Sequence, residues 1–215
     1  MLIIFDWDGT LCDSVGRIIA AMCEAARQQS APVPSEAAVR DIIGLGLHEA
    51  TARLFPGLSL EARDALRQAY SRVYLELDRD PAKLFAGARE VLDDLRSAGH
   101  RLAIATGKSR RGLDRVLKGL DVGHLFHASR CADECRSKPH PQMLRELLVQ
   151  LEFEQTDSLM IGDSELDLEM AHAAGIDRIG VSYGVHTAER LQQWEPLAVL
   201  DTLPGLLSMP RLSTA

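Results

Sequence analysis

One stretch decides the fold of this chain and locates its chemistry: Leu2-Ile-Ile-Phe-Asp-Trp-Asp-Gly-Thr10. Its first four residues form a short continuous apolar run, which predicts a strand buried on both faces, as in a parallel sheet. The run ends in two carboxylates two residues apart, Asp6 and Asp8. Burying an unpaired carboxylate is costly, so both need water, a cation or hydrogen-bond donors as partners. Taken alone, the pattern also fits a strand end with an Asx-type turn.

Length and composition describe a protein with a substantial core and an acidic surface. The chain has 215 residues, of which 46% are apolar and 26% charged, and its formal net charge is −7. This length allows one large domain, or a core of about 130 to 150 residues with a smaller domain attached. The negative charge argues against nucleic acid or an anionic membrane as the main partner. An anionic ligand would therefore need a locally positive site.

The sequence predicts a cytoplasmic protein without a membrane partner. No apolar run approaches the roughly 20 residues of a membrane span, and the first residues lack the basic start of a secretory signal. The four cysteines are then expected to be reduced thiols. Cys131 and Cys135 have no matching Cys or His pair nearby, which weakens a zinc site.

Two different periodicities divide the chain. From residue 14 to about residue 83, apolar residues recur at helical spacing, interrupted by the turn Gly44-Leu45-Gly46-Leu47-His48. Afterwards strands alternate with helices, and the expected strands are 102–105, 127–129, 159–161, 176–181 and 198–200. This alternation predicts an α/β fold with a doubly wound, Rossmann-like parallel sheet.

The same division predicts the domain organisation. We expect a core domain formed by residues 1–13 and 84–215, and an all-helical domain inserted at residues 14–83. A hinge is expected at Asp80-Pro81, and the tail from about Ser208 is expected to be frayed. The sequence leaves the oligomeric state open.

In a doubly wound sheet, ligands bind at the carboxyl ends of the strands, and polar residues follow several predicted strands here. Thr106-Gly107-Lys108 follows the second strand, where a hydroxyl and backbone N–H groups suit phosphate oxygens. The same residues are typical of an ordinary strand-to-helix loop. Lys138 precedes Pro139 at a predicted helix start, although most lysines are simply solvated.

An acidic motif follows the strand 159–161, in Gly162-Asp163-Ser164-Glu165-Leu166-Asp167. Ser164 to Asp167 matches a capping box, which would explain it structurally. However, Asp163 and Asp167 are predicted at the same sheet edge as Asp6 and Asp8. Hard oxygen ligands without imidazole or thiolate favour Mg²⁺ over zinc or copper.

In chain order, these four motifs resemble those of the haloacid dehalogenase superfamily, in the Asp-x-Asp-Gly-Thr form that its phosphatases use. The helical insert resembles the cap of the phosphoglycolate phosphatase and phosphoglucomutase-like branch. The resemblance implies a Mg²⁺-dependent phosphatase acting on a small phosphorylated metabolite, phosphoglycolate or a sugar phosphate. Two alternatives stay open. One is a phosphomutase, although these commonly carry an Arg where this chain has Gly46, Leu47 and His48; the other is a non-catalytic binding protein for a phosphorylated ligand.

The resemblance also implies a role for each motif residue. Asp6 would attack phosphorus and form an aspartyl-phosphate, and Asp8 would act as general acid and then general base. Mg²⁺ would be held by Asp6, the backbone carbonyl of Asp8 and Asp163, with Asp167 orienting Lys138 or a metal-bound water. The residues expected to contact the substrate are Trp7, His48, Thr106, Gly107 and Lys138.

Three further expectations concern residues outside these motifs. Lys108, Arg111, Arg115 and Lys118 share one helical face, which we interpret as solvated; a docking patch for an acidic partner or a phosphorylated polymer is the alternative. The seven histidines are expected mostly at the surface or in loops. The insert is expected to be a mobile lid whose 44–48 turn reaches over the ligand, unless that turn merely joins two helices.

Overall fold

The computed structural model describes residues 1–77 and 82–212, so the hinge expected at Asp80-Pro81 lies outside the described residues. Within them, six strands form one sheet in the order β3-β2-β1-β4-β5-β6, and every neighbouring pair is parallel. The strands are β1 (Leu2–Phe5), β2 (Arg101–Thr106), β3 (Ala128–Cys131), β4 (Ser158–Gly162), β5 (Asp177–Val181) and β6 (Ala198–Leu200). The chain runs outward from β1 in one direction and then, from β4, in the other. This confirms the predicted doubly wound fold and places its switch point beside β1.

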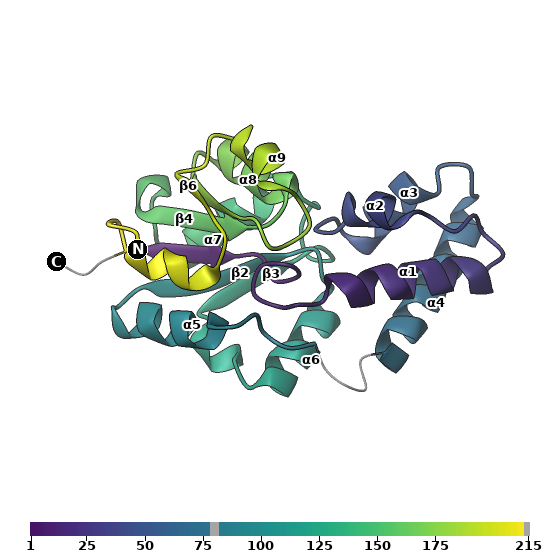
Figure 1. Ribbon diagram of the computed structural model, residues 1–215, viewed down its shortest axis with the longest axis horizontal. Helices are drawn as coiled ribbons and strands as arrows, with labels where there is room; N and C mark the ends of the chain where they lie inside the picture. Colours follow the sequence, from purple (N-terminus) through teal and green to yellow (C-terminus); the bar gives the residue numbers. More distant parts are fainter. Residues whose placement is uncertain (78–81, 213–215) are drawn as a thin grey trace.

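The central strand β1 is apolar throughout because helices cover both faces of the sheet (Figure 1). Ile3 and Phe5 pack into one buried cluster with α5 (Ala88–Ser97) and α6 (Arg110–Leu120). Leu2 and Ile4 pack into a second cluster with α7 (Gln142–Leu151) and α8 (Glu165–Ala174). Each of these side chains is fully buried, which stabilises the fold by about 1.5–3 kcal/mol per residue as an upper estimate.

In the described part of the chain, four helices between β1 and α5 form the insert, and they lie to one side of the sheet (Figure 1). They are α1 (Val15–Gln28), α2 (Glu36–Arg40), α3 (Leu47–Leu54) and α4 (Leu60–Leu77). The insert has its own apolar cluster, to which Met22 of α1 and Leu66 of α4 contribute. We use "the insert" below for these four helices and their connections.

The remaining elements are short. They are α9 (Ala188–Gln192) and three 3₁₀ helices, η1 (Gly123–Leu125), η2 (Gln155–Asp157) and η3 (Leu203–Ser208). The expectation of a frayed tail from Ser208 is wrong as far as residue 212. Leu212 is buried in the cluster beneath α5, and Arg211 pairs with Asp177. Among the described helices, none combines the length and apolarity needed to cross a membrane.

Candidate active site

The carboxyl ends of the three central strands bring three of the four motifs to one edge of the sheet. Phe5 pairs with Ile104 on one side and with Ile161 on the other. Asp6 and Asp163 directly follow β1 and β4, and Thr106 is the last residue of β2, so the three lie at the same end of the sheet. All three side chains are buried.

Three carboxylates form a buried cluster at this edge. Oxygens of Asp6, Asp163 and Asp167 all lie within 4.8 Å of one another. Burial raises the pKa of Asp6 well above its usual value, against the lowering effect of Lys138. Burial, reinforced by the charge of Asp167, raises the pKa of Asp163 to about 7. This cluster needs positive charge to hold its carboxylates ionised.

Lys138 supplies part of that charge. Its side chain is fully buried, and its Nζ donates to Asp6 Oδ1 at 2.5 Å and to Asp167 Oδ1 at 2.6 Å. Burial alone would lower the pKa of Lys138, but the charges of Asp167 and Asp6 outweigh it and raise that pKa. Lys138 is therefore a fixed buried cation, and the alternative of a solvated lysine is excluded.

Asp163 is held by Thr10 of the first motif and by Val185, which lies outside the motifs. Thr10 Oγ1 donates to Asp163 Oδ1 at 2.8 Å, and the backbone N–H of Val185 donates to Oδ2 at 2.8 Å. A Cβ atom at Gly9 or Gly184 would collide with the same carboxylate. Gly9 also has a φ of +88°, which disfavours any other residue there.

Asp167 has two partners at once. One oxygen accepts from Lys138, and the other accepts from the backbone N–H of Ser164 at 3.1 Å. Ser164 in turn caps α8, and the two residues form a complete capping box. The structural explanation of this motif and its place in the carboxylate cluster are therefore compatible.

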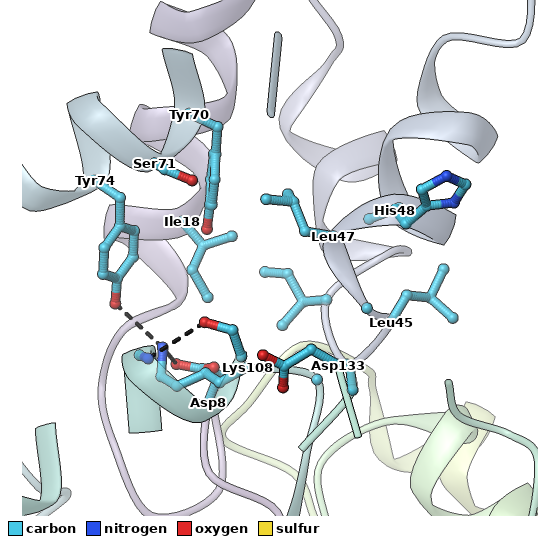
Figure 2. Close-up of a pocket in the computed structure, with 18 of the residues that line it drawn as sticks. Asp8, Ile18, Leu45, Leu47, His48, Tyr70, Ser71, Tyr74, Lys108 and Asp133 are labelled. Atoms are coloured by element: carbon cyan, nitrogen blue, oxygen red, sulfur yellow. Dashed lines mark hydrogen bonds and ion pairs between the residues drawn. The ribbon is translucent and has the colours of Figure 1, made fainter. Parts of the chain in front are cut away.

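Asp8 points away from the carboxylate cluster toward the insert. Its Oδ1 accepts from Ser14 Oγ and lies 2.9 Å from Lys108 Nζ. Lys108 also donates to the hydroxyl of Tyr74 at 3.4 Å and lies over its ring (Figure 2). Only 11% of the Lys108 side chain is exposed.

The expected solvated basic face is therefore wrong for Lys108. Arg111 and Arg115 follow it along α6 and line the same cavity, whereas Lys118 is exposed and lies outside the lining. Lys108 precedes α6, so only the other three residues are on the helix, and two of them, Arg111 and Arg115, line the cavity between insert and core.

A cavity of about 410 Å³ lies between the insert and the core, and Asp8 is in its lining. The 44–48 turn rests directly on the core beside it. A Cβ atom on Gly107 would lie 2.5 Å from the carbonyl oxygen of Gly44, and the Gly46 N–H donates to Ser137 Oγ at 2.8 Å. The turn is thus more than a link between two helices.

Trp7 and His48, both expected to contact substrate, lie in different surroundings. The Trp7 side chain is fully buried and packs edge-on against Phe126, with ring centroids 6.4 Å apart. It follows Ile3 and Phe5 on the same face of the strand, so it belongs to the core. His48 sits at the rim of the cavity with its ring directed away from Asp8, whereas Leu47 projects inward (Figure 2). The Trp7 side chain is therefore closed off from the cavity, whereas substrate contact by His48 stays a prediction.

One histidine is buried although it lies in a loop, between β5 and α9. His186 is buried, and its Nδ1 accepts from the backbone N–H of Glu165 at 2.9 Å. Beside it, Arg190 of α9 bonds Asp41 of the insert at 2.7 Å and Glu165 of the core at 2.8 Å. Burial, then the charge of Arg190, lowers the pKa of His186. These residues form a second contact between insert and core.

The donor set fits Mg²⁺. Asp6, Asp163 and Asp167 offer carboxylate oxygens close together at a buried edge, and such ligands suit a hard divalent cation. A divalent charge would also offset the mutual repulsion that raises the pKa values of Asp6 and Asp163.

Taken together, a switch-point cluster of carboxylates and a buried lysine defines a hydrolase site on a doubly wound sheet. The chain belongs to the haloacid dehalogenase-like hydrolases, whose family model matches residues 3–181. It is therefore an enzyme of the hydrolase class.

Relatives and a solved structure extend this likeness over almost the whole chain. The "Probable phosphatase IndB" of Dickeya dadantii is 35% identical, over 94% of this chain and 89% of its own. The phosphoglycolate phosphatase of Vibrio cholerae is 33% identical, over 99% of this chain and 97% of its own. The crystal structure of a predicted phosphoglycolate phosphatase from Haemophilus somnus superposes with a TM-score of 0.87 at 25% identity, covering 96% of each chain.

Proposed function

We propose that this protein is a Mg²⁺-dependent phosphatase that hydrolyses a small phosphomonoester through an aspartyl-phosphate on Asp6. The observation that carries the proposal is the placement of Lys138 between Asp6 and Asp167, with Asp8 facing the cavity. Family membership and the phosphatase names of relatives that cover the chain end to end support it.

The residues divide the reaction between them. In the first step, the Asp6 carboxylate attacks phosphorus, the bond from phosphorus to the ester oxygen breaks, and Asp8 donates a proton to that oxygen. In the second step, Asp8 takes a proton from water as the water attacks the phosphoryl group, which releases phosphate and restores the Asp6 carboxylate. Lys138, Thr106 and the backbone of Gly107 hold the phosphoryl oxygens.

Asp6, Asp163 and the backbone carbonyl of Asp8 would hold Mg²⁺. When bound, the ion supplies positive charge that lets a carboxylate approach an anionic phosphoryl group. Asp167 keeps Lys138 in place through its 2.6 Å hydrogen bond. Ser14 and Lys108 fix the direction of the Asp8 carboxylate.

The insert would act as the cap of the site, with residues 14–83 as one domain and residues 1–13 and 84–215 as the core. Its 44–48 turn closes one side of the cavity above Asp8. Phosphoglycolate and sugar phosphates are the first substrates to test, because relatives named phosphoglycolate phosphatase align with the full chain. The four free cysteines fit a reducing, cytoplasmic setting.

Phosphate release tests the proposal. The purified protein is assayed against a panel of phosphorylated metabolites with Mg²⁺, with EDTA, and with Mg²⁺ restored after EDTA. We expect release that EDTA abolishes and Mg²⁺ restores. Release that is indifferent to EDTA would refute the metal dependence, and binding of phosphorylated ligands without any release would favour the non-catalytic alternative.

A further inference from the structure

Two facing walls of the cavity above Asp8 are formed by aromatic and aliphatic side chains. Figure 2 shows Tyr70 and Tyr74 of α4 on one side, Leu45 and Leu47 of the 44–48 turn on the other, and Asp8 at the floor. Asp8 is the residue placed to protonate the ester oxygen, so the leaving group of a bound ester must occupy this space. The walls therefore contact the leaving group and not the phosphoryl group.

The aromatic wall presents carbon more than polar atoms. The rings of Tyr70 and Tyr74 lie 5.8 Å apart at an angle of 38°. The Tyr74 hydroxyl is engaged by Lys108 at 3.4 Å, and burial raises the pKa of Tyr70, which keeps its phenol neutral. Opposite them, the leucines offer no hydrogen bond. Between these two walls, the hydroxyl groups of a leaving group would lose hydrogen bonds to water and find few protein hydrogen bonds to replace them.

The charges in the cavity lining do not favour a leaving group that carries a negative charge of its own. Lys108 is paired with Asp8, and the lining also contains two further cations, Arg111 and Arg115, and two further anions, Glu49 and Asp133. The cavity of about 410 Å³ is within the range of sites that enclose whole organic ligands. Apolar surface on the leaving group is what these walls would bind best.

We propose that the substrate is a phosphomonoester of an apolar, ring-bearing alcohol, and that Tyr70 and Leu47 determine this specificity. This inference rests on the proposed phosphatase function and narrows its substrate class. A two-carbon acid such as the one in phosphoglycolate would leave both walls uncovered, whereas an aromatic ring would contact the tyrosines and the leucines together.

Three esters of primary alcohols test the class without a large difference in leaving-group chemistry: 2-phenylethyl phosphate, ethyl phosphate and glycerol 3-phosphate. For the wild-type protein with Mg²⁺, we expect kcat/KM for 2-phenylethyl phosphate to exceed the other two by at least about tenfold. Equal values for the three esters, or a preference for glycerol 3-phosphate, would overturn the inference.

Two variants test whether the cavity causes the preference for 2-phenylethyl phosphate. Leu47→Trp should fill the space and lower kcat/KM for 2-phenylethyl phosphate at least about tenfold, while ethyl phosphate changes less than about twofold. Tyr70→Leu should reduce the preference without filling the space. Leu60→Trp is the matched control, because Leu60 is on the same helix as Tyr70, is 60% exposed and lies outside the lining.

The possible outcomes distinguish a failure of the substrate inference from a failure of the proposed phosphatase function. If all esters are hydrolysed and Leu47→Trp slows them by one common factor, the phosphatase stands and the inference fails. If none of the three esters, nor acetyl phosphate, releases phosphate in the presence of Mg²⁺, the proposed function fails and the inference fails with it. Thermal unfolding of each variant shows whether a loss reflects the cavity or a misfolded insert, and Tyr70→Leu replaces Leu47→Trp if the latter does not fold.

Discussion

The Nζ atom of Lys108 lies 2.9 Å from Oδ1 of Asp8, so the candidate general acid is held by a cation that precedes α6. Lys108→Met removes this partner and leaves Ser14 alone to orient the carboxylate. We expect kcat to fall about 10- to 100-fold, because misorientation of a general acid forfeits part of its contribution. Steady-state kinetics on any hydrolysed ester measures it. Lys118→Met is the control, because Lys118 is exposed on α6 and lies outside the cavity lining. Equal effects of the two changes would refute the positioning role.

Substitutions in the two acidic motifs should differ in their effect on Mg²⁺ affinity. Asp163→Asn removes a carboxylate from the cluster, and we expect at least about tenfold weaker Mg²⁺ binding by calorimetric titration. Asp8→Asn preserves the backbone carbonyl proposed as ligand, so its Mg²⁺ affinity should stay within about twofold while its turnover falls. Equal losses of affinity in the two variants would contradict the assigned ligands.

The contact between Gly107 and the 44–48 turn should be intolerant of a methyl group. A Cβ atom at position 107 would lie 2.5 Å from the Gly44 carbonyl oxygen and 2.7 Å from that of Leu45, both of them backbone atoms. Gly107→Ala should therefore displace the turn, lower kcat/KM about tenfold and destabilise the fold by about 1–3 kcal/mol.

Gly119→Ala is the matched control for this change. Gly119 is in α6, the helix that follows Gly107, and the Cβ it would gain meets no neighbouring side chain or loop within 4 Å. We expect unchanged kinetics and slightly higher stability, by about 0.5–1 kcal/mol. If Gly107→Ala behaves like Gly119→Ala, the turn does not need to rest on the core during turnover.

His127 should make the fold less stable in acid. Its Nδ1 accepts from the Leu102 N–H at 3.1 Å, and burial followed by the charge of Arg96 lowers its pKa. The unfolded chain then takes up a proton near pH 6.5 that the folded protein resists. Stability present above that pH should be lost as the pH falls toward the folded-state pKa. The urea concentration at the midpoint of unfolding should drop between pH 7.5 and pH 5, and the drop should be larger for wild type than for His127→Gln. Equal drops in the two proteins would contradict this assignment.

Much of the fold was readable from the sequence because each strand of a covered parallel sheet is a short apolar run that stops at a polar residue. The central strand and the motifs after it follow this rule, and the parallel register brings Asp6, Thr106 and Asp163 to the same end of the sheet. The burial of Trp7 could also have been predicted from the sequence, although Trp7 was expected to contact substrate. Positions 3, 5 and 7 face the same side of an extended chain, and Trp7 continues the face of Ile3 and Phe5.

Other parts of the site depend on contacts across long stretches of sequence. Thr10 and the N–H of Val185 hold Asp163 from loops 153 and 22 residues away. Thr10 belongs to the first motif, but no local pattern identifies Asp163 as its partner, and none marks Val185. Lys108 and the arginines after it form an ordinary basic helix face until the insert packs over them. His186 and Arg190 gain their significance from Glu165 and from Asp41 of the insert. These relationships are tertiary, so periodicity alone could not supply them.

The central claim is that Asp6 takes up the phosphoryl group, and the turnover of Asp6→Asn tests it most directly. The amide is nearly isosteric with the carboxylate but far less nucleophilic. The substrate is acetyl phosphate, whose small leaving group makes few contacts with the cavity walls. At saturating Mg²⁺ we expect the rate of phosphate release by Asp6→Asn to be at least about a thousandfold lower than that of wild type. The thermal unfolding of the variant should show that it remains folded. Turnover within about tenfold of wild type in the folded variant would contradict the covalent mechanism.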